Sequence, residues 1–228
     1  MVNLEQVNYL DGFQRLVTKF LSLGKTILAS KLIEECRRNP HATIAYFYCK
    51  HEDPSRDSFI AFARSIISQL TRLNPSLLPF VLQVRTTSGT TSLQSSKLAK
   101  EILNTSVESF DNLILVIDGL DECIKAQKDE IVSWIKFAVA SAETDDSRIL
   151  RCCFLSQEDN DTGKLLKGFP TFRITEQHNN QDILHFCERG AAEIGQNFGL
   201  VPQEVQSLRD CVAKNADGET SHRIDLIY

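Results

Sequence analysis

The feature that most constrains the fold is an unbroken aliphatic run, Leu113 to Ile117, which ends at a carboxylate, Asp118. The run has the length of a strand and no polar alternation, so both faces of such a strand must be buried. Strands of this kind occupy the middle of parallel sheets that helices cover on both sides. The run therefore predicts an α/β fold with a mostly parallel central sheet.

Segments with strand and helix patterns alternate along the rest of the chain. Dense β-branched and aromatic runs predict strands over residues 43–49, 149–155 and 171–174. Apolar residues at helical spacing predict helices over 26–38, from 57 to about 70, from 96 to about 107, over 128–141 and over 182–198. Pro75 and Pro79 are expected to break up the region between the second and third helices, and a polar loop is expected over 86–96. The alternation favours crossover helices and a parallel sheet.

Composition excludes several classes of protein. The net charge is −5 and no basic cluster is apparent, which argues against a nucleic-acid partner. No apolar run approaches the roughly 20 residues that span a bilayer, and the amino terminus lacks the layout of a signal peptide. Seven scattered cysteines do not read as a disulfide framework or as a zinc site, so we expect free thiols in a cytoplasmic protein.

A first chemical motif is Gly24-Lys25-Thr26, which stands directly before a predicted helix. A phosphate-binding loop needs inward backbone N–H groups, a lysine for the phosphates and a hydroxyl for Mg²⁺. Lys25 and Thr26 match the last two roles, and the helix offers its positive end to an anion. Since the full motif has an earlier glycine that this chain lacks, Gly-Lys-Thr alone is weak evidence.

A second motif follows the aliphatic run: Asp118-Gly-Leu-Asp121-Glu122. The carboxyl end of a central parallel strand is where ligands bind in open α/β folds. We expect Asp118 to hold Mg²⁺ together with Thr26, and Asp121 or Glu122 to orient or deprotonate a water. Ser156, at the end of the next strand, is expected near the phosphates. An acidic turn without any ligand is the alternative interpretation of this motif.

Together the two motifs are more specific than either alone, because their order and spacing suit a P-loop NTPase. On these residues the chain resembles fungal NACHT-domain proteins with a nephrocystin-3-like N-terminal core. The resemblance is carried by Gly24-Lys-Thr-Ile-Leu-Ala-Ser, Ile44-Ala-Tyr-Phe-Tyr-Cys-Lys-His-Glu-Asp-Pro and Leu115-Val-Ile-Asp-Gly-Leu-Asp-Glu-Cys, and it runs from about Gly24 to Gly218.

The resemblance implies a P-loop NTPase with three α/β/α layers and a mostly parallel central sheet. It further implies a STAND-type signalling protein that binds ATP or ADP with Mg²⁺, switches between the two nucleotide states and self-associates. Proteins of this kind usually place an effector domain before the core and a repeat region after it. We expect a helical lead-in over residues 1–18, the NACHT-like nucleotide-binding domain over 19–218 and a tail over 219–228 with little to anchor it.

Several positions depart from the family pattern. Lys19 stands where the first loop glycine would be, and Leu23 stands where a small residue would ease the backbone path. Gln157 replaces the arginine that senses the γ-phosphate, and a neutral amide cannot make the same charged bidentate contact. We therefore expect weak or no hydrolysis, and a truncated or decaying copy of the family.

Three functions were compared on these grounds. The leading hypothesis is a nucleotide-binding switch domain whose ATP hydrolysis is slow at best. The alternative is a pseudo-NTPase, an interaction module that has lost nucleotide binding, which Lys19, Leu23 and Gln157 favour. A metabolic P-loop kinase is the weakest of the three, since no arginine-rich lid is apparent in the sequence.

Overall fold

The computed structural model describes residues 25–89, 92–144, 147–157, 159–174, 188–196, 198–215 and 222–227. These residues fall into two compact units: a larger one over 25–172 with 223–227, and a smaller one within 173–222. The predicted lead-in over 1–18, Gly24 and both predicted domain boundaries lie outside the described residues.

The elements of the chain run in this order: α2 (Lys25–Cys36), β1 (Thr43–Tyr48), α3 (Phe59–Leu73), the short 3₁₀ helix η1 (Pro75–Leu77), α4 (Leu78–Ser88), α5 (Ser96–Glu108), β2 (Asn112–Asp118), the 3₁₀ helix η2 (Leu120–Glu122), α6 (Lys125–Glu143), β3 (Ile149–Gln157), α7 (Asn160–Leu165), β4 (Thr171–Ile174), α9 (Pro202–Asn215) and β5 (His222–Ile227). Residues 188–196, before α9, are also helical.

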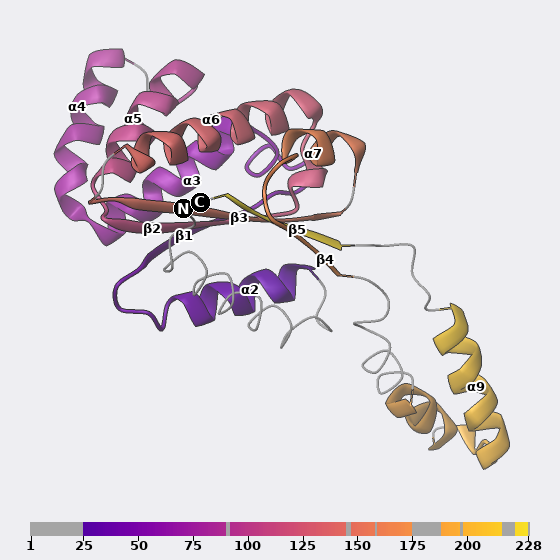
Figure 1. Cartoon of the computed structure of the whole chain (residues 1–228). Helices are drawn as coiled ribbons and strands as arrows, with labels where there is room; N and C mark the ends of the chain where they lie inside the picture. Colours follow the sequence, from indigo (N-terminus) through magenta and orange to yellow (C-terminus); the bar gives the residue numbers. More distant parts are fainter. Residues whose placement is uncertain are drawn as a thin grey trace. The chain divides into compact units, whose positions relative to one another are not determined.

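The sheet has the strand order β1-β2-β3-β5-β4, and its first three strands are parallel. The aliphatic run forms β2, which is flanked by β1 on one side and β3 on the other (Figure 1). The predicted α/β class and the parallel arrangement of the central strands are therefore confirmed.

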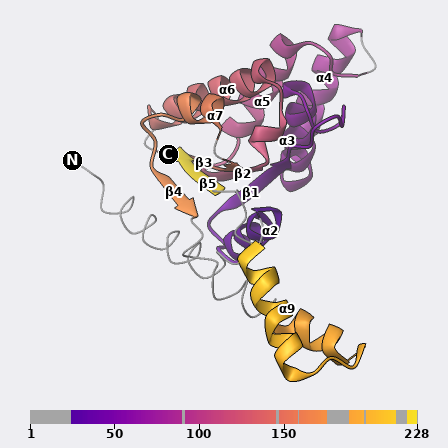
Figure 2. The same ribbon diagram turned by 90° about the vertical axis from the view of Figure 1, so that its right-hand side faces the viewer.

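Helices cover both faces of this sheet. Along β2, Leu113, Leu115 and Ile117 belong to one core cluster with residues of α3, α5 and α6. Ile114 and Val116 alternate with them and are equally buried, on the face that α2 covers (Figures 1 and 2). A strand that is buried on both faces explains why the run shows no polar alternation, and the layers are compatible with an α/β/α architecture.

The larger core is organised around α3. Ser58 caps this helix by accepting a hydrogen bond from the Ala61 N–H, and Phe62 lies fully buried at the end of its first turn. The Phe62 ring centroid is 5.6 Å from that of Phe47 on β1 and 5.6 Å from that of Trp134 on α6. Trp134, predicted as a core residue, is indeed buried, and its indole N–H donates to Asn104.

Several elements differ from the sequence prediction. The prolines do not prevent helical structure after α3. Pro75 begins η1, and Pro79 lies in the first turn of α4. Proline is tolerated in a first turn because the backbone N–H that it lacks would have no partner within the helix. Helices α7 and most of α9 were not predicted. The segment expected to be an unanchored tail contributes β5, because Ile224 and Leu226 alternate with charged residues in the period of a strand.

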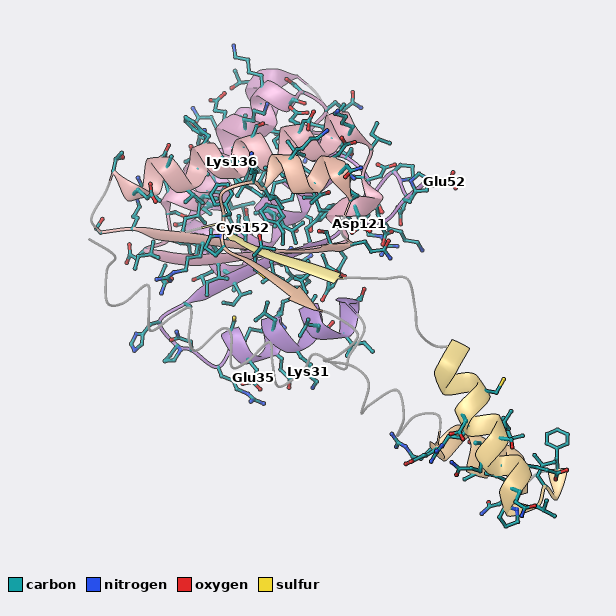
Figure 3. The ribbon with its side chains drawn as sticks, turned by 45° about the vertical axis from the view of Figure 1, so that its right-hand side comes forward. Lys31, Glu35, Glu52, Asp121, Lys136 and Cys152 are labelled. Atoms are coloured by element: carbon teal, nitrogen blue, oxygen red, sulfur yellow. The ribbon has the colours of Figure 1, made fainter. Side chains whose placement is uncertain are left out.

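The structure bears on two further expectations from composition. Within the described part of the chain, no helix is both long enough and apolar enough to cross a bilayer. Cys36, Cys49, Cys123 and Cys152 are free thiols, and the cysteines on β3 are buried; Cys152 lies in the middle of the sheet, under the helix that carries Lys136 (Figure 3).

Candidate functional site

The carboxyl ends of β1, β2 and β3 meet at one edge of the sheet. Tyr48 is the register partner of Asp118, and Asp118 is the register partner of Leu155. Parallel strands therefore bring the segments after these residues together, although they are far apart in sequence. Figure 3 shows Asp121 at this end of the sheet, with Glu52, from the segment after β1, on the same side.

The first turn of α2 reaches this edge. The Thr26 hydroxyl donates a 2.8 Å hydrogen bond to Oδ2 of Asp118, across 92 positions of sequence. Asp118 is buried, whereas Thr26 is exposed. The structure thus brings together the two residues that the sequence predicted as Mg²⁺ ligands. Lys25 begins α2; the position of its side chain lies outside the described part of the structure.

A left-handed glycine turns the chain sharply at the end of β2. Gly119 has a φ of 74°, and its N–H donates to the Leu155 carbonyl at 2.8 Å. A Cβ at this position would lie 3.1 Å from the carbonyl oxygen of Cys49, which is closer than ordinary van der Waals contact. Only glycine combines this conformation with this approach. The turn directs η2, with its two carboxylates, back over the strand ends.

The two carboxylates of η2 tie the neighbouring loops to β2. Asp121 accepts a hydrogen bond from the Gln157 N–H at 2.9 Å, at the end of β3. Glu122 accepts one from the His51 N–H at 3.1 Å, in the loop after β1. Both side chains therefore hold backbone in place at the candidate site. Their expected role in activating a water stays a prediction.

Ser156 is fully buried at the end of β3, one residue beyond the register partner of Asp118. Its hydroxyl makes no hydrogen bond to any part of the chain that the structure describes. A buried hydroxyl without a partner costs about 1–3 kcal/mol, so native proteins rarely keep one without a reason. Side chains alternate along a strand, so Ser156 faces the side of the sheet that α6 covers, together with Cys152 and Phe154, whereas Asp118 meets Thr26 on the α2 side. The expected place of Ser156 near the phosphates stays a prediction.

Two thiols lie beneath the same edge. Cys49 and Cys123 are both buried, and the Cys49 N–H donates to the Asp118 carbonyl at 2.8 Å. The hydrogen bond between the two thiols and the burial of the site raise the pKa of Cys49 well above its usual value. This thiol therefore stays neutral at physiological pH. The cysteines look scattered in the sequence, because nothing in their spacing indicates that Cys49, after β1, lies beside Cys123, after η2.

An ion pair that the sequence did not indicate supports the segment after β3. Lys128 of α6 is buried, and its Nζ lies 2.9 Å from Oδ2 of Asp159. Asp159 also caps α7, by accepting from the N–H and hydroxyl of Thr162. Although burial raises the pKa of Asp159, the hydrogen bonds from Thr162 and Lys128 outweigh it, so the net shift is downward. The Asp-x-x-Thr spacing was the available signal, since it is typical of a helix N-cap.

Comparison with protein families places these segments in one known group. The sequence profile of the family described as "Nephrocystin 3, N-terminal" matches residues 21–157, which is more than half of the chain and includes α2, β1, β2 and β3. Comparisons with curated proteins and with solved structures give no significant match. The matched range includes the Thr26–Asp118 contact, the Gly119 turn and Ser156. The chain therefore belongs to the nephrocystin 3 N-terminal family.

Proposed function

We propose that this chain is the nucleotide-binding switch domain of a STAND-type NACHT P-loop NTPase, which binds ATP or ADP with Mg²⁺ and hydrolyses ATP slowly or not at all. The observation that carries the proposal is the hydrogen bond between Thr26, in the first turn of α2, and Asp118, at the end of the central strand. In P-loop proteins a hydroxyl and a carboxylate in these two places hold the same Mg²⁺.

The surroundings of this contact fit a phosphate group. The amino end of α2 carries unpaired N–H groups and a partial positive charge, and it lies beside the Asp118 carboxylate. Mg²⁺ prefers oxygen ligands, which the Thr26 hydroxyl and Asp118 supply, and when bound it would neutralise phosphate charge. Lys25 would pair with the phosphates.

Slow hydrolysis is supported by one residue that would have to promote it. Asp121 and Glu122 each accept a backbone N–H on one carboxylate oxygen, which leaves the other oxygen able to accept from a water. Gln157 stands where proteins of the resembling family carry the arginine that contacts the γ-phosphate, and a neutral amide cannot make that charged contact. A binding switch with little turnover is therefore favoured over an efficient enzyme. Self-association in one nucleotide state belongs to the same proposal.

The deciding experiment is thermal melting with and without millimolar Mg-ATP and Mg-ADP. A ligand at a hundredfold its Kd adds about 2.7 kcal/mol, which raises the Tm of a domain of this size by about 5–10 °C. Lys25→Ala should abolish the shift. Lys31→Ala is the matched control, because Lys31 lies on the same helix but its half-exposed side chain is paired with Glu34 (Figure 3).

The outcomes separate the two leading functions. A shift that survives in Lys31→Ala and vanishes in Lys25→Ala supports the switch; an equal shift in both variants contradicts it. No shift in a cooperatively folded protein favours the alternative, an interaction module that no longer binds nucleotide. Gln157→Arg tests the account of slow turnover, since a restored charged contact should raise the rate of phosphate release.

A further inference from the structure

A groove lies between α3, α4 and α5, away from the strand ends that form the candidate site. Its volume is about 520 Å³, and its lining comes from these three helices and from Ser92 and Leu93. Figures 1 and 2 show α4 at the outer edge of the helical layer that α3 and α5 also form. Pockets for small ligands usually measure about 300–1,000 Å³, so the groove has the size of a ligand site.

One face of α3 forms a wall of the groove. Its lining residues are spaced three or four apart, which places them on one stripe of the helix: Arg64, Ile67, Ser68, Thr71 and Arg72. The guanidinium of Arg64 donates to the Leu93 carbonyl and so secures the segment before α5. Arg72 follows Arg64 by eight positions, so the Cα atoms of the two arginines stand about 12 Å apart along the helix axis.

The Arg72 end of the stripe carries unused polar groups. Arg72 is exposed and forms no hydrogen bond or ion pair with the residues that the structure describes. The neighbouring Thr71 hydroxyl is buried, and within those same residues it has no hydrogen-bond partner. Because this hydroxyl is enclosed, the exposed guanidinium of Arg72 is the donor that can receive a carboxylate in the groove.

The opposite wall is apolar and only partly covered. Leu78 and Val81 of α4 line the groove, and Leu78 is 46% exposed. Ile67 and Ile102 also line it and are buried. Arg85 adds a third positive charge, and no acidic side chain is among the described lining residues. Apolar walls with only cationic charges favour an anion that carries an apolar body.

We propose that this groove binds a small anionic amphiphile, a carboxylate with an apolar chain. The carboxylate is received by Arg72, and the chain lies along Ile67, Val81 and Ile102. Burial of the chain supplies most of the affinity, and the guanidinium supplies the preference for an anion. A small ligand is favoured over a helical peptide because the volume of about 520 Å³ lies in the range of small-ligand pockets.

The test is a titration of the full chain with dodecanoate and with dodecan-1-ol, which differ only in the headgroup. Calorimetry should show one saturable site that prefers the carboxylate. Arg72→Ala should weaken dodecanoate binding about tenfold, or about 1.4 kcal/mol, and leave the alcohol unchanged. Arg38→Ala is the control, because it also removes one exposed arginine, which follows the C-terminal end of α2 and does not line the groove. Equal affinities of wild type and Arg72→Ala for dodecanoate would overturn the assignment.

A second pair of variants tests the apolar wall. Val81→Asp places a negative charge in the groove and should abolish binding, whereas Leu82→Asp, at an exposed position of α4 outside the lining, should not. Dodecanoate binding that survives Val81→Asp overturns the proposal. The proposal is also overturned if the folded protein shows no saturable binding of dodecanoate. It is equally overturned if the groove binds an acidic amphipathic peptide, or a second copy of the chain, and not dodecanoate. Lys25→Ala should leave dodecanoate binding intact, so this proposal can fail independently of nucleotide binding.

Discussion

Replacing Gly119 by alanine should destabilise the fold more than the same replacement at Gly89. Both glycines are left-handed, with φ values of 74° and 64°. A Cβ at Gly89 would meet nothing within 4 Å, whereas a Cβ at Gly119 would lie 3.1 Å from the Cys49 carbonyl oxygen. The pair therefore separates the effect of backbone conformation from that of close approach.

The magnitude follows from these two terms. A left-handed conformation costs a non-glycine residue about 1–2 kcal/mol, which applies at both positions. The contact at Gly119 is difficult to relieve, because the Cys49 N–H is itself bonded to the Asp118 carbonyl at 2.8 Å. Forcing extra volume into a packed site costs about 1–3 kcal/mol. We expect Gly119→Ala to lower the free energy of unfolding by about 2–5 kcal/mol, and Gly89→Ala by about 1–2 kcal/mol.

Urea denaturation can measure both values with the fluorescence of Trp134, the chain's single tryptophan, which is buried in the core. The nucleotide-dependent shift in Tm should also shrink in Gly119→Ala, since the turn orients η2 over the strand ends. Equal losses of stability in the two variants would refute the reasoning, because the approach to Cys49 would then contribute nothing.

Three further results are expected. Phe62→Ala should cost about 3–5 kcal/mol in chemical denaturation because Phe62 is fully buried, whereas Phe137→Ala, at a position 59% exposed, should cost little. Lys128→Met should cost about 1–3 kcal/mol by the same measurement, because it leaves Asp159 without its buried cation. Burial, helped by the charge of Glu35, raises the pKa of Cys36 from 9.0 to about 11. The thiol therefore loses its proton at lower pH in the unfolded chain than in the folded one. Its contribution to the free energy of unfolding should be fully present below pH 9 and should be lost between about pH 9 and 11, so the Tm should fall over this range less steeply in Cys36→Ala than in the wild type.

Much of the larger unit could be predicted because its strands are unusually clear. The predicted strands at 43–49, 149–155 and 171–174 agree with β1, β3 and β4 to within two residues. Such runs leave few alternatives, since β-branched and aromatic residues in short, dense runs favour strands. Helix α4 was missed because Pro79 was interpreted as a break, although proline is compatible with a first helical turn.

The candidate site was only partly visible from the sequence. The residue types and their order were enough to select Thr26 and Asp118, because few folds place a Gly-Lys-Thr before a helix and an aspartate after a buried strand. The roles of Asp121 and Glu122 as acceptors of backbone N–H groups were not visible. Their partners lie in loops after other strands, and the register of the sheet decides which loops come close.

By itself, the sequence determined the α/β class, the central position of β2 and the identity of the candidate Mg²⁺ ligands, because these depend on local hydrophobic pattern and residue type. Only the tertiary structure decided that the Thr26 hydroxyl reaches Asp118, that the buried Ser156 hydroxyl has no hydrogen-bond partner among the described residues, and that α3 and α4 leave a groove beside Arg72. Those contacts join residues far apart in the chain, so they depend on how helices and strands pack and not on the period of any one segment.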